Sequence, residues 1–127
     1  MKTGAVHTKR WNDPAEEGDG HRILVCRYRP RALRKDAETW EAWMPQLGPS
    51  RALHADIYGK HGTPIAWAAF RRRYLAEMEA EREAIQALAQ RIARGETLTL
   101  LCSSACTDAA QCHRSLLKGL IEGADAR

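Results

Sequence analysis

Long hydrophobic runs are absent from this sequence, and their absence excludes a membrane protein. No stretch approaches the roughly 18 consecutive apolar residues that a membrane-spanning helix needs, so no membrane partner is expected. The stretch 1–10 contains no hydrophobic segment that would direct secretion, so we expect a cytoplasmic protein. Internal repeats and low-complexity tracts are missing too. We therefore expect one soluble domain over residues 1–127, with its core at about 4–122.

Several motifs of well-understood chemistry are also missing. No glycine-rich loop of the Walker or dinucleotide-binding type occurs, which argues against a tightly wrapped nucleoside triphosphate. The phosphatase pattern places an arginine six residues after its cysteine, but six residues after Cys106 this chain has Cys112. Paired Cys-x-x-Cys knuckles, from which zinc fingers and ribbons are usually built, are absent. We therefore expect no metal and no other cofactor.

Most of the basic side chains present are arginines, and they give the chain a mild positive charge. The net charge is +4 and the isoelectric point is about 9.1. This bias favours anionic partners, although the charge run of a dedicated DNA-binding protein does not occur. The planar guanidinium of arginine suits phosphate and carboxylate groups.

Alternating and continuous apolar stretches predict three strands, at 4–11, 22–28 and 97–102, and a flexible polar loop at 12–21. Their order among the predicted helices indicates an α/β fold, a small single domain with a short, mainly parallel sheet. In such folds the carboxyl ends of parallel strands share one edge, which is where ligands usually bind.

Capping residues and apolar spacing predict the helices of this fold. The long one is an amphipathic crossover helix, and the last is a C-terminal helix whose tail, 123–127, is expected to fray. Helical spacing also predicts that most of the rings of Trp40, Trp43, Trp67 and Tyr74 lie in the core. The predicted helices cover 37–44 behind Asp36, a short segment between Ser50 and Gly59, a long stretch from Thr63 and Pro64 to Gly95, and a final stretch from about 109.

The segment "LLCSSACTDAAQCHR" (100–114) holds all but one of the cysteines, and it is the candidate catalytic region. Cys102 ends a predicted strand and Cys112 lies in the first turns of a predicted helix, where the helix dipole favours a thiolate. His113 is the candidate base, and it reaches Cys102 more easily than its neighbour Cys112, because adjacent helical side chains diverge.

Three other interpretations of this segment stay open at the sequence level. In the first, Cys112 is a small core residue and His113 is a hydrogen-bonded histidine at a helix end, and neither takes part in chemistry. Alternatively, Cys102, Cys106, Cys112 and His113 would bind zinc, although two consecutive helical ligands are awkward. An oxidised pair of Cys106 and Cys112 is the third alternative.

A candidate anion-binding crevice is predicted where the strands end. The last helix offers free N–H groups and the positive end of its dipole to an anion. The alternative is that the arginines pair with Asp36, Glu38 or C-terminal carboxylates instead. The candidate ligand-binding residues are Arg27, Arg29 and Arg31 after one strand, Ser103 and Ser104 after another, and Arg114 in the last helix.

Four stretches carry a resemblance to a known family: "GDGHRILVCRYRPRALRKD", "W…LGPS", "HGTPIAWAAFRRRYLAEM" and "TLTLLCSSACTDAAQCHR". The chain resembles the bacterial domain-of-unknown-function family 488 over roughly residues 5–122. The resemblance implies a compact α/β fold and a mostly cytoplasmic protein, and it implies no established activity. His61 matches a family histidine, so the resemblance adds it to the crevice. Members usually have an aspartate at the position of Cys26, and one branch keeps "LLC…CHR" as this chain does.

These observations predict a protein that binds, or catalyses a reaction of, a phosphorylated or other anionic small ligand at the carboxyl ends of the strands. Whether it is an enzyme stays open. The alternative is a non-catalytic nucleic-acid-binding module that uses the arginine-rich loop. A protein-partner adaptor is a third class, and it would need an exposed apolar patch.

Overall fold

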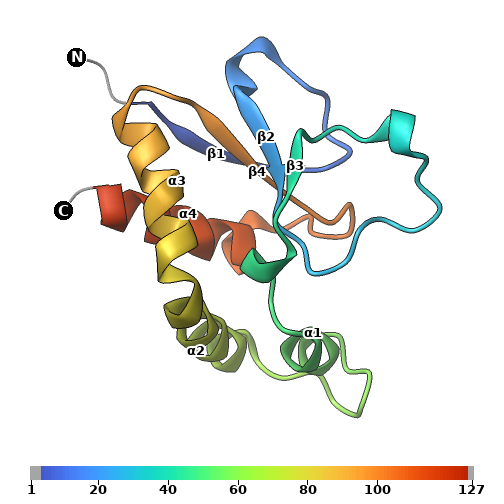
Figure 1. Ribbon diagram of the computed structural model, residues 1–127. Helices are drawn as coiled ribbons and strands as arrows, with labels where there is room; N and C mark the ends of the chain where they lie inside the picture. Colours follow the sequence, from blue (N-terminus) through green and yellow to red (C-terminus); the bar gives the residue numbers. More distant parts are fainter. Residues whose placement is uncertain (1–3, 126–127) are drawn as a thin grey trace.

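Four short parallel strands form the sheet of the computed structural model, which describes residues 4–125. The sheet order is β1-β4-β2-β3, and every neighbouring pair is parallel. All carboxyl ends therefore lie at one edge, and the predicted α/β class with a short parallel sheet is confirmed (Figure 1). The strands are β1 (Val6–Arg10), β2 (His21–Leu24), β3 (Ala42–Trp43) and β4 (Leu98–Cys102).

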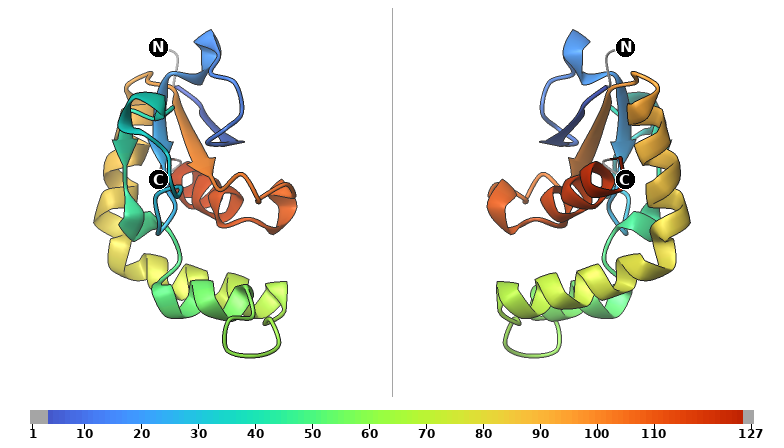
Figure 2. Two further views of the ribbon diagram at one scale, coloured as in Figure 1. Left: turned by 90° about the vertical axis from the view of Figure 1, so that its right-hand side faces the viewer. Right: turned by 90° about the vertical axis from the view of Figure 1, so that its left-hand side faces the viewer.

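The structure has four α-helices in its described part, and two of them pack together on one face of the sheet. These two are α3 and α4, while α1 and α2 lie beside one another beyond the edge of the sheet (Figures 1 and 2). Of the helices in the described part of the chain, none has the length and apolar character to cross a membrane. The helices are α1 (Arg51–Ile57), α2 (Trp67–Met78), α3 (Arg82–Ala93) and α4 (His113–Asp125).

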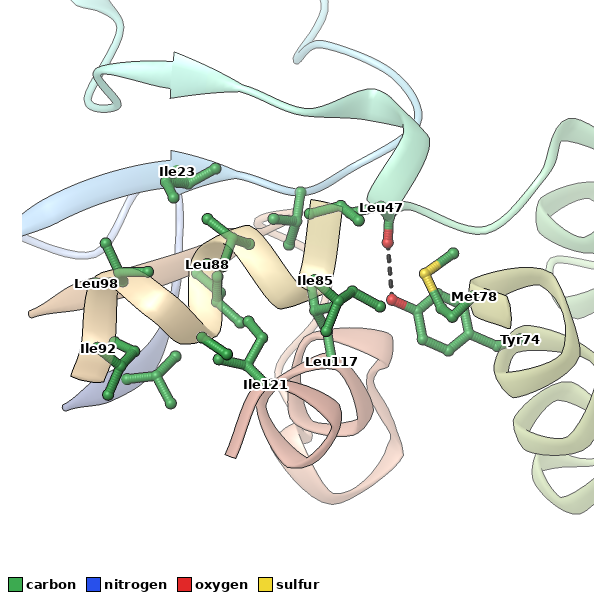
Figure 3. Packing of buried hydrophobic residues seen from close by; sticks show 14 of the residues in the cluster. Ile23, Leu47, Tyr74, Met78, Ile85, Leu88, Ile92, Leu98, Leu117 and Ile121 are labelled. Carbon is green, nitrogen blue, oxygen red and sulfur yellow. Dashed lines mark hydrogen bonds between the residues drawn. The ribbon is translucent and has the colours of Figure 1, made fainter. Parts of the chain in front are cut away.

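The main core fills the space between the sheet and these helices. Successive strand residues point to opposite faces, so alternate residues of β2 and β4, such as Ile23 and Leu98, face the helices. Figure 3 shows these side chains against Leu88 and Ile92 of α3. At the far end of the core, the hydroxyl of buried Tyr74 donates a hydrogen bond of 2.7 Å to the carbonyl of Leu47 (Figure 3).

A second, smaller cluster lies on the other face of the sheet. Leu24 and Leu101 pack there against Trp40, which belongs to the irregular segment between β2 and β3. On the same side Asp19 is buried in an ion pair with Arg22 and accepts a 2.8 Å contact from Lys9. The polar loop after β1 is thus anchored to the sheet at its end, and His21 already belongs to β2.

The long helix predicted from Thr63 to Gly95 is wrong in two respects. It begins at Trp67, because the N–H of Ile65 donates to the carbonyl of Asp56 and keeps the preceding residues extended. It is also interrupted by a 3₁₀ turn at 79–81, beyond which α3 starts in a new direction (Figure 2). Glu79 and Ala80 of this turn are exposed and Glu81 is half-buried, so no buried apolar side chain holds the helix straight there.

The helix predicted at 37–44 is also wrong, since its end forms strand β3. The N–H groups of Glu41 and Met44 donate to carbonyls of Arg22 and Leu24, so pairing with the edge of β2 replaces local helical bonds. One consequence concerns Trp43, which was expected in the core and is 42% exposed instead.

The last helix begins later than predicted. A 3₁₀ turn covers 109–111, with the carboxylate of Asp108 accepting from the N–H of Ala110, and Cys112 is extended before α4 starts at His113. The predicted frayed tail is helical as far as Asp125, and its remaining residues, 126–127, lie outside the described part.

Candidate ligand pocket and cysteine cluster

A pocket of about 1050 Å³ opens at the carboxyl edge of the sheet. Most of its lining comes from three segments that are distant in sequence: the loop after β2, the loop after β4, and α1 with the turn behind it. This is the edge at which a parallel α/β sheet usually binds ligands. The sequence therefore predicted the position of the pocket but not the part that α1 plays in it.

Most of the predicted site residues line this pocket. The predicted ligand residues Arg114 and His61 lie outside its lining. Arg114 is buried beside the loop instead, with 6% of its surface exposed, and His61 is exposed in the turn after α1. The residues that the structure brings together are Arg27, Arg29, Arg31, Cys102, Ser103, Ser104, Cys112 and His113.

The three arginines after β2 differ in how much of their charge is available. Arg27 donates to the carbonyls of Pro49, at 2.9 Å, and Gly48. Arg29 pairs with Glu38 at 2.6 Å, so the alternative that an arginine is used in a salt bridge holds for this residue. Arg31 is exposed and forms no ion pair with the described residues.

Two further basic residues of the pocket were missed at the sequence level. Arg51 and Lys60 line it from the start of α1 and from the turn behind α1. Their sequence neighbours give no signal, because only the packing of α1 brings them to the sheet edge. Asp108 is the acidic side chain found in the lining, so positive charge dominates the pocket.

Aromatic side chains stand exposed around the same pocket. Tyr28, Trp43 and Tyr58 are 43%, 42% and 55% exposed, and they are the large apolar side chains exposed in the described part of the chain. His54 lies between the two tyrosines, with ring centroids 4.9 Å from Tyr28 and 4.6 Å from Tyr58. The indole N–H of Trp43 donates to the carbonyl of Cys26 at 2.8 Å, which fixes the ring at the pocket wall.

At the inner end of the pocket, the sulfur of Cys102 meets both Cys112 and His113. The thiol of Cys112 donates to Cys102 Sγ at 3.2 Å, and His113 Nδ1 lies 3.9 Å from Cys102 Sγ. His113 Nε2 lies 2.8 Å from the carbonyl of Val25, which only accepts, so Nε2 carries the proton. Nδ1 is then the free acceptor, and burial lowers the pKa of His113 and keeps the ring neutral.

Cys106 and Cys26 complete a cluster of thiols around Cys102. We call Cys26, Cys102, Cys106, Cys112 and His113 the cysteine cluster. Hydrogen bonds from Cys102 and Cys112, together with the charge of a nearby arginine, lower the pKa of the half-buried Cys106 thiol. Hydrogen bonding within the cluster and burial raise the pKa of Cys102 and of Cys112. The thiolate of the cluster is therefore expected at Cys106, a residue that sequence reasoning left out of the catalytic candidates.

Arg114 is the arginine behind this effect on Cys106. Its Nε and Nη1 atoms are buried, and neither has a hydrogen-bond partner among the described residues. A buried guanidinium without a partner is costly, so it favours negative charge in its neighbourhood. Arg114 thus contributes to the field of the cluster and not to the pocket surface.

Comparison with known proteins gives two matches and no structural template. A family model described as "Active DUF488-N3 subclade" matches residues 6–125, which include the whole lining of the pocket. "Uncharacterized protein YeaO" of Escherichia coli (strain K12) is 38% identical over 99 residues, which are 78% of this chain and 83% of that protein. No solved structure matches the chain.

Proposed function

Because the chain belongs to domain-of-unknown-function family 488, we propose its function from its pocket: it binds and acts on a small ligand that carries an anionic group, such as a phosphate. The observation that carries this proposal is the excess of basic side chains around one pocket at the carboxyl edge of the sheet. The description of the matching family model as "active" favours an enzyme over a passive binding protein.

The basic side chains differ in what they offer to a ligand. Arg31 and Arg51 are exposed and form no ion pair with the described residues, so they are ready to meet an anion. Arg27 is held in place by hydrogen bonds to the carbonyls of Pro49 and Gly48. Since a positively lined cleft concentrates anions, these residues favour a phosphorylated or carboxylated ligand.

The exposed rings indicate the rest of the ligand. Tyr28, Trp43 and Tyr58 line the same walls as the arginines. Aromatic faces beside cationic groups suit a flat ring that carries a phosphate, because stacking and charge pairing act on different parts of the same molecule. A nucleoside monophosphate is a suitable representative of this class.

The cysteine cluster is the proposed source of chemistry. Cys102, Cys112 and His113 lie at the inner end of the pocket and stay our candidates for a covalent or acid–base step. His113 is oriented by Val25 and presents an unprotonated nitrogen to Cys102, which is the arrangement of a base beside a thiol. A cytoplasmic location stays part of the proposal, as it would keep these thiols reduced.

The test is binding of a nucleoside monophosphate, with its nucleoside and inorganic phosphate for comparison, measured by calorimetry. The double variant Arg31→Gln/Arg51→Gln is expected to bind the monophosphate at least about tenfold more weakly, since tenfold corresponds to about 1.4 kcal/mol for two exposed charges. The control is Arg71→Gln/Arg72→Gln, which removes two exposed charges from α2. Equal weakening in both double variants would contradict a specific anion site.

A second candidate, a nucleic-acid-binding module, is favoured by the alternation of Tyr28 with Arg27 and Arg29 along the pocket wall. Stacking rings beside cations are the usual means of holding single strands. This alternative predicts that a single-stranded oligonucleotide binds much more tightly than the mononucleotide and that its affinity falls steeply with salt. It also predicts that the control variants on α2 weaken binding, because long polyanions use dispersed charge.

A further inference from the structure

The arrangement of three sulfur atoms points to a site that the spacing of the cysteines in sequence does not suggest. The Sγ atoms of Cys102, Cys106 and Cys112 all lie within 4.8 Å of one another, and those of Cys102 and Cys112 are 3.2 Å apart. Zinc binds cysteine sulfur at about 2.3 Å, so sulfur atoms on a tetrahedral zinc ion lie roughly 3.8 Å apart. The Cys102–Cys112 separation is shorter than this value and the 4.8 Å limit for the set is longer, so small side-chain shifts would seat a metal ion.

Three different pieces of backbone hold these sulfurs in place. Cys102 is the last residue of β4, Cys106 lies in the loop behind it, and Cys112 immediately precedes α4. The loop is closed by backbone bonds from Cys106 to Ser103 and from Gln111 to Asp108. Convergence of three thiols therefore follows from the fold of a short segment, and it does not need paired cysteine knuckles.

The position of His113 separates it from this set. His113 Nδ1 groups with Cys26 and Cys102, and not with Cys106 and Cys112. The difficulty that two consecutive residues rarely bind one ion is thus removed, because the neighbours Cys112 and His113 fall into different sets. Three cysteine ligands then leave a fourth position, and all three cysteines line the pocket.

Charge balance supports a metal in the three-cysteine set. Three thiolates and one divalent zinc ion have a net charge of about −1 by simple addition, with each thiolate deprotonated by the metal. The guanidinium of Arg114 lies buried close to Cys106, and two of its nitrogen atoms have no hydrogen-bond partner among residues 4–125. A metal centre with a net charge of about −1 would neutralise this cation, as a single thiolate at Cys106 also would.

We propose that Cys102, Cys106 and Cys112 bind a zinc ion, with the fourth position open to the pocket. An ion of this kind polarises an oxygen of a bound anion or a water molecule, which are the uses of zinc with three protein ligands. Cys102 and Cys112 then act as metal ligands and not as nucleophiles. The metal site does not depend on the proposed anionic ligand, and either can be wrong without the other.

The test is titration of the reduced full-length chain with Co²⁺ under anaerobic conditions, followed by displacement with Zn²⁺. We expect saturation at one ion per chain, with sulfur-to-cobalt charge-transfer absorption and the strong visible bands of tetrahedral cobalt. Cys106→Ser, in the loop, is expected to weaken binding at least about tenfold, the lower bound for the loss of even an indirect ligand contact. The matched control Cys26→Ser is expected to keep the affinity and the spectrum.

Several results would overturn the zinc site. They are the absence of charge-transfer absorption in the reduced chain, full binding by Cys106→Ser, and loss of binding by Cys26→Ser. Peptide mapping of the freshly purified chain that finds Cys102 joined to Cys112 would also overturn it, since the sulfurs would then serve as a redox pair. Circular dichroism of each variant checks that the fold is retained, and phosphate binding by the metal-free chain is measured separately.

Discussion

The hydroxyl group of Tyr74 provides a test of how the core supports the pocket. The side chain is completely buried, and its hydroxyl donates to the carbonyl of Leu47 at 2.7 Å. That carbonyl accepts no other hydrogen bond from the described residues. Replacing Tyr74 with Phe keeps the ring, including its stacking on Phe70 at 6.0 Å, and removes the donor alone.

The expected loss follows from the polar group that is left behind. A buried carbonyl without a donor costs about 1–3 kcal/mol, so we expect Tyr74→Phe to lower the free energy of unfolding by about 2 kcal/mol. For a domain of this size that corresponds to a decrease in Tm of about 6–8 °C. Urea denaturation followed by tryptophan fluorescence measures the first quantity, and calorimetry measures the second.

The same substitution is expected to weaken the pocket indirectly. The carbonyls of Gly48 and Pro49, which follow Leu47, hold the guanidinium of Arg27. If Leu47 moves, Arg27 loses its fixed position, and ligand affinity should fall with stability. Tyr58→Phe is the matched control, since its exposed ring should leave stability within about 0.5 kcal/mol of the parent chain. A loss for Tyr74→Phe as small as that of the control would refute the reasoning.

Two further predictions concern the anchors of the loops. Burial raises the pKa of Asp19, but hydrogen bonds from Lys9, the N–H of Glu16 and Arg22 outweigh it, so its pKa in the folded chain lies below the ordinary value. The ionised Asp19 therefore stabilises the fold fully above about pH 4, and this stabilisation is lost as the pH falls through the folded pKa. In Asp19→Asn the free energy of unfolding should depend less steeply on pH in this range, as measured by acid unfolding with circular dichroism. A Cβ added at Gly48 would lie 2.4 Å from the backbone nitrogen of Arg27, so Gly48→Ala should lower Tm. A Tm equal to the parent's would show that the backbone at Gly48 and the backbone at Arg27 can move apart at little cost.

The strands and the start of α1 were predictable because their signals are local. Continuous apolar runs give β2 and β4, and the side chain of Ser50 accepts from the N–H of Leu53, as its capping position suggested. Strand β3 was not predictable, because its two residues are extended only through bonds to β2. The turn at 79–81 escaped prediction for a similar reason, since only the packing of α2 against α1 and of α3 against α4 requires two directions.

The residues of the candidate site also fall into those that could be predicted from local sequence and those that could not. The contact of Cys102 with His113 was predictable because both residues flank one short loop. Tyr58 and Lys60 were not, since they reach the pocket only after α1 has packed beside α2. Cys106 was considered only as a zinc ligand or disulfide partner and not as a catalytic candidate, because its spacing fits no known knuckle and its distance from Cys112 depends on the shape of the loop. Contacts between residues close in sequence could therefore be predicted, and contacts that depend on tertiary packing could not.

The order of strands in the sheet has a consequence for how the molecule is made. β4 lies between β1 and β2, which do not pair with one another, yet it is the last strand along the chain. During synthesis the edges of β1 and β2 that pair with β4 stay unpaired until residues 98–102 emerge from the ribosome. Such distant pairing is slow to form. A nascent chain stalled before β4 should thus be more exposed to proteases and aggregation than the finished protein.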